Sequence, residues 1–397
     1  MKRKKSIVYL GYHSFPYGLA EVQKIILISK SLLLTGNKVT IIGRNGTHNK
    51  KDHPELTAHG FYENIEYIYA SGSSFRDEKF LNRRLWKIKG FINEIRVLRE
   101  RKKKNELDYA ILSTRSFSST VYYSILAKLI GFKTILNYVE YYSAMKKKPS
   151  EVGKRLNDSL FDKYGTSVTS ATFLISDFLI NHMKKVSPDK KYLKIPGLTD
   201  FEKYNGIEFN TGEKYFLYCG AAGYKEIIKF CIDAFGILKS NRPSYLYLVI
   251  NGTDADMQEV KNYINSHLKK DLIKVYSKLS EKQLYTYYKN AAALLIPLRP
   301  TFQDFARFPH KTGEYLASGN PVISTNYGEM KIYFKDMENM FLAESYDVNQ
   351  FAEKMQFVID EPEQAEKIGQ RGKSVASRIF DYRNVAKDID SFLEAEL

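Results

Sequence analysis

The sequence predicts an α/β fold made of two doubly wound domains in tandem, each a parallel sheet covered by helices. Short β-favouring runs alternate with amphipathic helical segments along most of the chain, which is typical of parallel βαβ units. The alternation pauses over residues 192–215 and then restarts. A chain of 397 residues is also longer than one hydrophobic core normally supports, so we expect two domains of about 200 residues each.

The first half opens with residues 6–12 (SIVYLGY), a continuous β-favouring run of the kind that a strand buried on both faces needs. After a Pro-Tyr-Gly turn, residues 20–36 place apolar side chains at helical spacing and end at Gly36. Residues 38–43 (KVTIIG) are then a second expected strand, which completes a βαβ unit. The same rhythm returns over residues 108–114, 121–131 and 133–139.

Residues 192–215 contain Pro, Gly and Asn with little periodicity, which indicates a connection between domains. The alternation beyond this connection predicts a second sheet, and helical sequence fills most of the chain after its last expected strand. Its expected strands are residues 215–220, 244–252, 273–277, 292–298 and 321–326, and the helices between them are 224–240, 258–270 and 280–291. Ligands of doubly wound sheets bind beyond the carboxyl ends of the strands. The loops to inspect therefore follow Tyr9, Cys219, Ile250, Tyr276, Ile296 and Ser324.

The composition is that of a folded protein with a large positive charge. Apolar residues make up 44% of the chain and charged residues 27%, which excludes a disordered protein. The formal net charge of +16 favours anionic partners such as nucleic acid, phosphorylated metabolites or an acidic membrane surface. Cys219 and Cys231 are the only cysteines, so neither a disulfide framework nor a cysteine-based zinc site is expected.

The sequence contains no recognisable targeting or membrane-spanning segment. The basic N-terminus is followed by an apolar stretch over residues 7–10, which is too short for a signal peptide. No window approaches 18 uninterrupted apolar residues, the length that a spanning helix needs. We therefore expect a cytoplasmic protein.

Residues 305–324 (FARFPHKTGEYLASGNPVIS) combine charged side chains with the start of a helix. Lys311 and Thr312 lie in the expected first turn, just after Pro309, where proline is tolerated. The N–H groups and positive dipole end of such a turn suit a phosphate, and Lys311 adds a point charge. Glu314 can accept hydrogen bonds from sugar hydroxyls. The alternative is a solvated lysine and a glutamate that only the helix dipole favours.

The segment RFPHKTGEYLASGNPVISTNYGE, residues 307–329, resembles the donor-site motif of glycosyltransferase family 4, whose members have the GT-B fold. The resemblance covers essentially the full chain and is strongest in its second half. It implies transfer of a sugar from a nucleoside diphosphate donor to an acceptor, with retention at the anomeric carbon. The further similar segments are residues 15–36 (FPYGLAEVQKIILISKSLLLTG), 215–235 (YFLYCGAAGYKEIIKFCIDAF), 278–298 (KLSEKQLYTYYKNAAALLIPL) and 351–376 (FAEKMQFVIDEPEQAEKIGQRGKSVA).

The resemblance also implies a domain organisation. We expect two Rossmann-like domains with a cleft between them: residues 1–200 for the acceptor and residues 212–380 for the nucleotide-sugar donor. Residues 381–397 are expected to form a helix that packs back toward the first domain. The acceptor would be a glycan or a lipid-linked molecule of bacterial surface polysaccharide or glycolipid synthesis.

Matched residue by residue, Glu314 corresponds to the second Glu of a paired pattern that holds the nucleotide ribose in the family. The first Glu belongs eight positions earlier, where this chain has Ala306. The carboxylate that normally touches the donor sugar is therefore missing, and Asp304 is the candidate to replace it. The identity of the sugar stays open at this point.

Lys225 matches a basic residue that resembles a diphosphate clamp. The Arg that usually precedes this lysine is absent, because Ala221 and Ala222 occupy that region. Arg307 and Lys311 are the candidates to supply the missing charge. A pyrophosphate leaving group needs such compensation, because negative charge builds on it as the glycosidic bond breaks.

The resemblance assigns further positions. Gly18 matches an N-terminal glycine loop, Glu140 follows a strand of the first domain, and Ser277 to Leu279 fall where the family's backbone contacts the base. Plain alternatives are a turn glycine for Gly18 and a surface or capping residue for Glu140. The expected catalytic residues are Lys225, Lys311 and Glu140. The expected donor-binding residues are Gly18, Gly220, Lys225, Ser277, Leu279, Arg307, Lys311, Thr312 and Glu314.

No metal or other cofactor is expected. Residues 254–256 (DAD) resemble a metal-binding Asp-x-Asp, but they open an expected helix, where Asp is favoured for capping and for the dipole. The histidines lack metal-ligand spacing, and no P-loop is present. We therefore expect donor binding without metal.

Residues 79–104 form a basic amphipathic stripe, with eleven Lys or Arg against two Glu. Leu81, Leu85, Ile88, Ile92 and Ile95 recur in it at helical spacing. This pattern suits a helix that lies on an anionic membrane leaflet, and the alternative is a surface helix whose apolar face packs on its own domain. The residues expected to face the membrane are Arg83, Arg84, Trp86, Lys87 and Lys89.

Three other functions remain open: a GT-B-fold nucleotide-sugar epimerase, a basic nucleic-acid-binding protein, and a sugar-nucleotide binder without catalysis. An epimerase needs acid and base groups near the sugar, where this chain has Ala306. Nucleic-acid binding would interleave basic and aromatic residues on an exposed sheet. The positive charge concentrates instead on one helix and at expected phosphate sites, so no nucleic-acid partner is expected.

Overall fold

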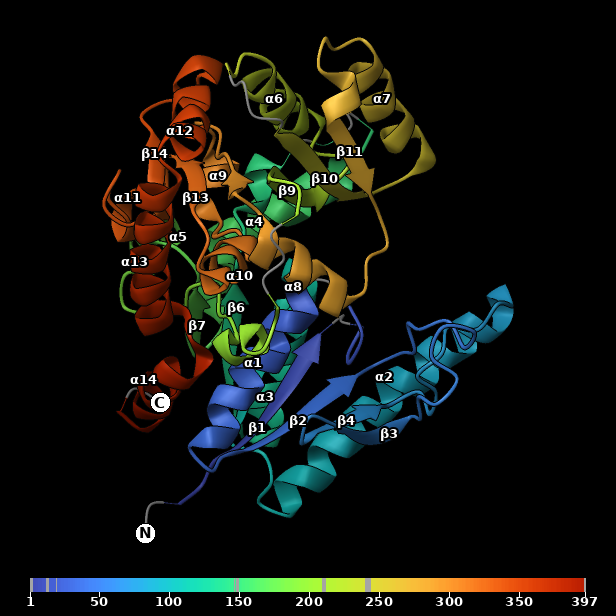
Figure 1. Ribbon diagram of the computed structural model, residues 1–397. Helices are drawn as coiled ribbons and strands as arrows, with labels where there is room; N and C mark the ends of the chain where they lie inside the picture. Colours follow the sequence, from blue (N-terminus) through green and yellow to red (C-terminus); the bar gives the residue numbers. More distant parts are fainter. Residues whose placement is uncertain are drawn as a thin grey trace. The chain divides into compact units, whose positions relative to one another are not determined.

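The computed structural model describes residues 3–11, 14–18, 20–145, 147, 150–208, 212–239 and 244–395. Residues 1 and 2 of the expected first domain and residues 396 and 397 of the expected C-terminal helix lie outside this part. The chain divides into two compact units (Figure 1). Unit 1 comprises Met1–Leu198 and Tyr382–Leu397, and unit 2 comprises Thr199–Asp381. Each unit has helices around a sheet that is wholly or almost wholly parallel, which confirms the predicted fold class.

The sheet of unit 1 has the strand order β3-β4-β2-β1-β5-β6-β7-β8, and all neighbours are parallel except β3 and β4. Its central strand β1 is almost fully buried, as its continuous apolar run predicts. The β3–β4 hairpin has no counterpart among the expected elements. The strands are β1 (Ser6–Gly11), β2 (Lys38–Gly43), β3 (His59–Tyr62), β4 (Ile65–Tyr69), β5 (Tyr109–Ser113), β6 (Lys133–Tyr138), β7 (Ala171–Leu174) and β8 (Lys191–Lys194). The helices are α1 (Ala20–Leu34), α2 (Phe80–Lys103), α3 (Phe117–Ile130), α4 (Val152–Val168), α5 (Asp177–Val186) and α14 (Tyr382–Ala395), with a short turn η1 (Tyr142–Ala144).

Helix α14 belongs to unit 1 and packs on α1, although most of the chain separates the two in sequence. It is strongly amphipathic, and Ile389, Phe392 and Leu393 are buried in the core of unit 1. Each such side chain stabilises the fold by about 1.5–3 kcal/mol relative to an exposed position. The hydroxyl of Ser31 donates a hydrogen bond of 2.6 Å to the Tyr382 carbonyl, which fixes the start of the helix.

The sheet of unit 2 is fully parallel, with the order β11-β10-β9-β12-β13-β14. All five expected strands are present, and β14 is an additional strand in the stretch that was expected to be mostly helical. The strands are β9 (Tyr215–Ala221), β10 (Tyr245–Asn251), β11 (Ile273–Tyr276), β12 (Ala293–Ile296), β13 (Val322–Thr325) and β14 (Phe341–Ala343). The helices are α6 (Lys225–Gly236), α7 (Asp254–Asn265), α8 (Glu281–Asn290), α9 (Phe302–Ala306), α10 (Lys311–Ser318), α11 (Glu329–Tyr333), α12 (Val348–Asp360) and α13 (Pro362–Phe380), with turns η2 (Phe201–Tyr204) and η3 (Lys270–Leu272).

Each sheet has a topological switch point, where successive strands leave in opposite directions. In unit 1 it lies between β1 and β5, and in unit 2 between β9 and β12. Loops at the carboxyl ends of such neighbouring strands diverge and leave a crevice, which is the usual ligand site of open α/β sheets. The loops after these four strands are therefore the expected positions of a ligand site.

Lys24 on α1 is an unusual part of the unit 1 core. Its side chain is buried, and its Nζ has no hydrogen-bond partner among the described residues. Burial lowers the pKa of Lys24 from 10.5 to about 7, because the uncharged amine is the form that an apolar interior tolerates. Between these two pH values the unfolded chain binds more protons than the folded one, so the free energy of unfolding rises with pH.

We expect Lys24→Met to raise the free energy of unfolding by about 2–4 kcal/mol at pH 7, since methionine fills the site without a buried amine. The gain should shrink as the pH approaches 10, where the amine is uncharged in both states. Urea unfolding from pH 6 to 10, followed through the fluorescence of Trp86, the single tryptophan, reports on unit 1. Lys128→Met, at an exposed position on α3, is the control. An unchanged pH slope in Lys24→Met would contradict the expectation.

Candidate functional site

The candidate site of unit 2 is built from the loops after β9 and β12, the two strands at the switch point. β9 leads through a short turn into α6, and β12 leads into α9 and then α10. The helix expected from residues 305–324 is therefore present as α10, preceded by the single turn of α9. Gly319 ends α10 with a φ of 84°, a left-handed conformation that glycine adopts without strain.

Lys311 and Glu314 form an ion pair at the start of α10. The Lys311 Nζ lies 2.9 Å from Glu314 Oε2, and His310 Nε2 lies 3.4 Å from Glu314 Oε1. Only 13% of the Glu314 side chain is exposed, so these groups are not the solvated pair of the alternative interpretation. Burial alone would raise the pKa of Glu314, but Lys311 and His310 outweigh it and the pKa is lowered. Burial alone would lower the pKa of Lys311, but the negative charge of Glu314 has the larger effect and the pKa of Lys311 is raised.

Aromatic rings surround this ion pair. The Lys311 Nζ lies 5.5 Å from the ring centroid of Tyr288, which packs edge-on against Tyr315. The Tyr315 hydroxyl accepts a hydrogen bond of 2.9 Å from the Cys219 N–H, which ties α10 to β9. Tyr204 is buried, and burial followed by the charge of Glu314 raises the pKa of its hydroxyl. The pair thus lies in surroundings of low polarity, where charges interact strongly.

Thr312 follows Lys311 and is fully buried. Its backbone N–H donates to the Pro309 carbonyl at 2.9 Å, and its Oγ1 has no hydrogen-bond partner among the described residues. Buried hydroxyls are normally hydrogen-bonded, so an unsatisfied one at a helix start is a feature to explain. A bound acceptor oxygen at this end of α10 would explain it.

Asp304 is fully buried in α9, and two arginines engage its carboxylate. Arg299 donates to it from Nε at 2.8 Å, from Nη2 at 3.1 Å and from its backbone N–H at 2.9 Å. Arg307 Nη2 lies 2.7 Å from Asp304 Oδ1, which also accepts from Arg299 Nη2. The expectation that Asp304 replaces the missing sugar-binding Glu is therefore not supported by its placement. Its carboxylate holds two guanidinium groups instead.

Arg299 was missed among the expected site residues. The hydrogen bonds that it donates to Asp304 are the main cause of a raised pKa for its guanidinium. The signal that points to it is its position three residues after β12, in a loop that the strand-end rule had already marked. A buried carboxylate partner five residues away was not evident from spacing alone.

Arg307 is also fixed by its surroundings. Its guanidinium lies over the ring of Tyr224 at 5.1 Å from the centroid, and Nη1 donates to the Tyr224 hydroxyl at 3.0 Å. Its Nε is buried and has no hydrogen-bond partner in the described part of the chain. Arg307 thus links α9 to the turn after β9, with one N–H group still available.

Lys225 is the first residue of α6, but carboxylates already surround its charge. The Nζ lies 3.1 Å from Asp256 Oδ1 and also pairs with Glu259, both on α7. A hydrogen bond to Glu259 is the main cause of its raised pKa. Asp256 lies in the first turn of α7 and its N–H is capped by Thr253, which agrees with the helix-start interpretation of residues 254–256.

The other expected residues of unit 2 lie at strand ends. Gly220 is in β9, where an added Cβ would lie 2.6 Å from the Tyr218 hydroxyl, so packing alone explains the glycine. Ser277 and Leu279 flank Lys278, whose φ is 53° and whose N–H donates to Asn251 Oδ1 at 2.9 Å. This side-chain contact fixes the loop after β11 to the end of β10.

Unit 1 has a separate cavity of about 310 Å³ at its own switch point. Arg44 lines it and is held by Glu94 of α2 at 2.7 Å and by the Tyr123 hydroxyl at 3.0 Å. Neither Gly18 nor Glu140 lines this cavity. A Cβ on Gly18 would lie 2.4 Å from Val22 Cγ2, and Glu140 is half-buried after β6. The lining residues are Gly11, Glu21, Arg44, Asn45, Ser113, Thr114, Arg115, Ser116, Ser119 and Tyr123.

The chain resembles known proteins both in sequence and in structure. Residues 200–375 match the family model described as glycosyl transferases group 1. Among curated proteins, the chain is 23% identical over 273 residues to the alpha-1,3/1,6-mannosyltransferase ALG2 of Dictyostelium discoideum. This alignment covers 65% of the chain and 58% of that protein, so the chain spans little more than half the length of this relative.

Solved structures resemble the chain over almost its whole length. Sucrose-phosphate synthase from Thermosynechococcus elongatus has a TM-score of 0.76 at 15% identity, with 98% of each chain covered. HepE from Anabaena, in complex with UDP and glucose, has a TM-score of 0.68 at 13% identity, with 98% of this chain and 100% of that chain covered. At these identities the likeness establishes the fold, which is the predicted GT-B fold of two parallel-sheet units.

Proposed function

We propose that the protein moves a sugar from a nucleoside diphosphate donor to a glycan or lipid-linked acceptor, because residues 200–375 match the family model of the glycosyl transferases of group 1. The observation that carries the proposal is the Lys311–Glu314 ion pair at the start of α10, at a switch point that also gathers Arg299 and Arg307. The resemblance to glycosyltransferase family 4 further supports retention at the anomeric carbon and a role in bacterial surface polysaccharide or glycolipid synthesis.

In this proposal the start of α10 binds the nucleotide. Lys311 supplies positive charge to the diphosphate, the helix dipole adds to it, and the unsatisfied Thr312 Oγ1 donates to a phosphate or ribose oxygen. Glu314 accepts hydrogen bonds from the ribose hydroxyls with the lone pairs that Lys311 and His310 leave over. Because Glu314 is held by both neighbours, it is positioned before the ligand arrives.

The arginines stabilise the leaving group. As the glycosidic bond breaks, negative charge grows on the diphosphate, and fixed cations lower the energy of that state most when they need not move. Asp304 holds Arg299 and Arg307 in place by bonds of 2.7–3.1 Å. The planar guanidinium suits phosphate oxygens, so Arg307 takes the place of the arginine that the chain lacks before Lys225. This arrangement requires no metal, and we propose that EDTA leaves activity unchanged.

The donor sugar is recognised by groups other than the usual glutamate. Ala306 is fully buried, and the Asp304 carboxylate is occupied by arginine. HepE, a protein of the same fold, was solved with UDP and glucose, so UDP and UDP-hexoses are the first ligands to test.

Calorimetry and thermal shift with UDP, GDP and ADP should show binding of at least one of them by the full chain. A screen of nucleotide sugars for slow hydrolysis should then release the matching nucleoside diphosphate. If none of the three stabilises the protein, the proposal is wrong. A nucleotide sugar recovered with one inverted hydroxyl and no released diphosphate would indicate an epimerase instead.

A further inference from the structure

Helix α2 of unit 1 is attached to its unit along one narrow side. Of its residues, all of which the structure describes, only Gly90, Glu94 and Leu98 are buried. A Cβ on Gly90 would lie 2.2 Å from the Arg44 carbonyl oxygen, so only glycine permits this close approach of helix and loop. Glu94 is fully buried and pairs with Arg44. The contacts fix which face of α2 is turned toward solvent.

The opposite side of α2 is an exposed apolar row. Leu81, Leu85, Ile88 and Ile92 follow one another at intervals of four, three and four residues, which places them on one face of a helix. Their exposed fractions are 74%, 65%, 60% and 52%. The alternative interpretation, in which this face packs on its own domain, is therefore wrong.

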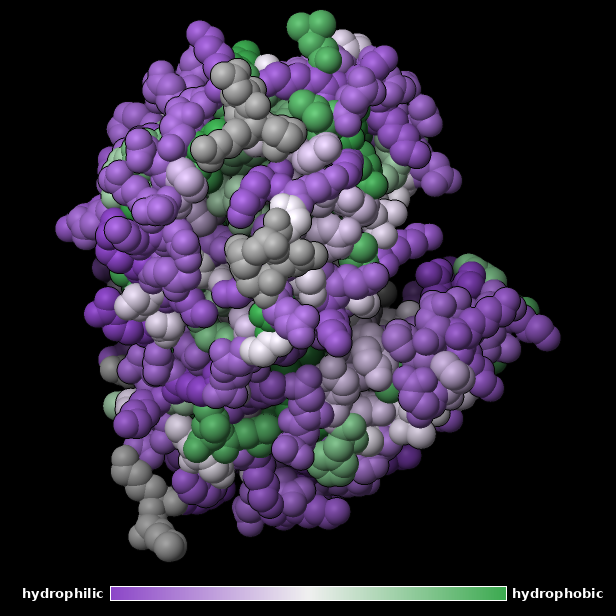
Figure 2. All heavy atoms as spheres, in the orientation of Figure 1, coloured by the Kyte–Doolittle hydropathy of each residue, from purple (hydrophilic) through white to green (hydrophobic). Residues whose placement is uncertain are grey.

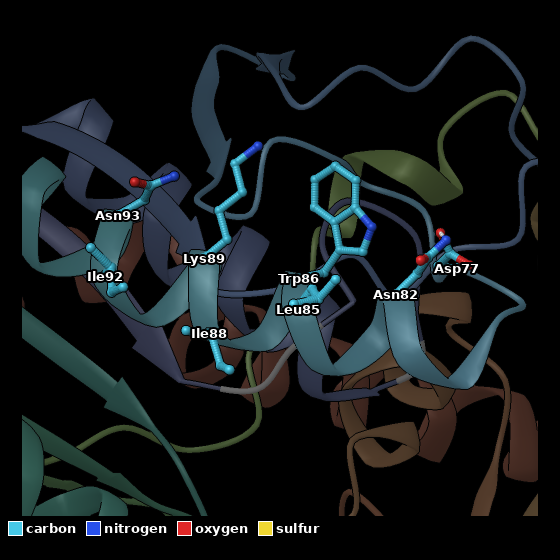
Figure 3. Close-up of a pocket in the computed structure, with 8 residues that line it drawn as sticks. All are labelled: Asp77, Asn82, Leu85, Trp86, Ile88, Lys89, Ile92 and Asn93. Atoms are coloured by element: carbon cyan, nitrogen blue, oxygen red, sulfur yellow. Dashed lines mark hydrogen bonds between the residues drawn. The ribbon is translucent and has the colours of Figure 1, made fainter.

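Such a row stands out on this protein. On the face drawn in Figure 2 most side chains are hydrophilic, and hydrophobic ones gather only in small groups. Figure 3 shows Ile88 projecting from the side of α2 that faces away from Trp86. A continuous exposed apolar face generally marks an interaction surface.

The charges around the row select the partner. Arg84 and Lys89 are exposed on the two sides of it, and Arg96 and Arg99 continue beyond its end. One of the two glutamates of α2, Glu94, is buried and neutralised by Arg44. The exposed charges of α2 are therefore cationic, except for that of Glu100. Centres of protein interfaces are depleted in lysine, and an aliphatic row offers nothing to nucleic acid. An anionic lipid surface matches both parts, because it accepts apolar side chains below a layer of negative headgroups.

We propose that α2 binds an anionic lipid surface, with Leu81, Leu85, Ile88 and Ile92 inserted at the level of the acyl chains and the flanking cations at the headgroups. Within the described part of the chain, no helix has the length and hydropathy needed to cross a bilayer. The helix therefore lies along the surface. This inference does not depend on the proposed sugar transfer.

Two of the residues expected at the membrane have other contacts. Arg83 donates to the backbone carbonyls of Asp77 and Glu78, at 3.4 and 3.0 Å, and thus fixes the start of α2. Trp86 lies 4.7 Å from the Lys89 Nζ and, together with three residues of the apolar row, lines an open cavity of about 720 Å³ (Figure 3). We therefore assign lipid contact to the apolar row, Arg84 and Lys89, and not to Lys87, which lies three residues before the buried Gly90 and so on the attached side of α2.

Co-sedimentation of the full chain with phosphatidylcholine vesicles, with and without 30% phosphatidylglycerol as roughly the charge density of an anionic leaflet, tests the proposal. We expect binding to the anionic vesicles only, weakened by salt. Leu85→Ser with Ile88→Ser should reduce the bound fraction at least tenfold at any salt concentration. Arg84→Glu with Lys89→Glu should remove the preference for anionic lipid.

The matched control is Ile125→Ser with Leu129→Ser, which changes two equally exposed apolar residues of α3 and should leave binding unchanged. Fluorescence of Trp86 and the urea midpoint verify that each variant is folded. Equal binding to neutral vesicles, or undiminished binding by the Leu85 and Ile88 variant, would overturn the proposal. So would absence of vesicle binding, including the case in which α2 pairs two copies of the chain in solution.

Discussion

Replacing Lys311 with methionine is expected to lower the affinity for the nucleoside diphosphate at least tenfold, a loss of about 1.4 kcal/mol or more. The change removes the cation nearest the start of α10 and leaves the Glu314 carboxylate with His310 as its remaining charged partner. A buried carboxylate that has lost its lysine has a higher pKa, so the variant should bind the diphosphate more weakly at pH 8 than at pH 6, because the carboxylate becomes charged and repels it. Calorimetry at pH 6 and pH 8 measures both effects.

Two further variants serve as controls for Lys311→Met. Lys331→Met changes an exposed lysine of unit 2 and should leave the affinity unchanged. Lys225→Met should have a smaller effect than Lys311→Met, because Asp256 and Glu259 already neutralise Lys225. Equal losses from Lys225 and Lys311 would mean that Lys225 leaves its partners to reach the diphosphate. Full affinity in Lys311→Met would contradict the role proposed for α10.

Asp304→Asn is expected to lower the free energy of unfolding of unit 2 by about 2–4 kcal/mol, since two largely buried arginines lose their shared carboxylate. The amide has one acceptor oxygen and places an N–H₂ group against a guanidinium, so most of the three hydrogen bonds from Arg299 are lost. Nucleotide affinity should fall as well, because Arg307 is no longer held. Urea unfolding followed by far-ultraviolet circular dichroism, together with calorimetry, measures both quantities.

The control for this variant is Asp254→Asn, which makes the same chemical change at an exposed position of α7. It should alter the free energy of unfolding by about 0.5 kcal/mol or less through the helix dipole. If Asp304→Asn is as stable as this control, the carboxylate does not organise the arginines. A folded but weakly binding Asp304→Asn would separate positioning of the arginines from stability.

The features that the sequence predicts well are local. The buried strands at residues 6–11 and 215–221 are continuous apolar runs, and α10 begins and ends where Pro309 and Gly319 indicate. The ion pairs are harder to predict, because the partners of a charged residue often lie on other elements. Nothing in the spacing shows that Lys225 meets Asp256, or that Asp304 is enclosed by arginine on both sides. Those contacts depend on how α7 and α9 pack.

Helix α2 shows another limit of sequence analysis. The spacing of Leu81, Leu85, Ile88 and Ile92 identifies one apolar face, but the same spacing describes a face against a core or against lipid. Gly90 and Glu94 decide the matter, because they carry the contacts with the loop after β2. The sequence alone does not show this role, because a glycine and a glutamate inside a helix do not usually mark the face that packs on the domain.

The pairing of Arg44 with Glu94 connects α2 to the cavity of unit 1. The residue that lines the unit 1 cavity is held by the same helix that presents the apolar row, and the Arg44 carbonyl is in close contact with Gly90. If attachment to lipid shifts α2, it shifts Arg44, so a ligand that contacted Arg44 in the cavity would share a coupling free energy with lipid binding. That coupling is reciprocal: a ligand that draws Arg44 inward must change the affinity of α2 for the surface by the same factor.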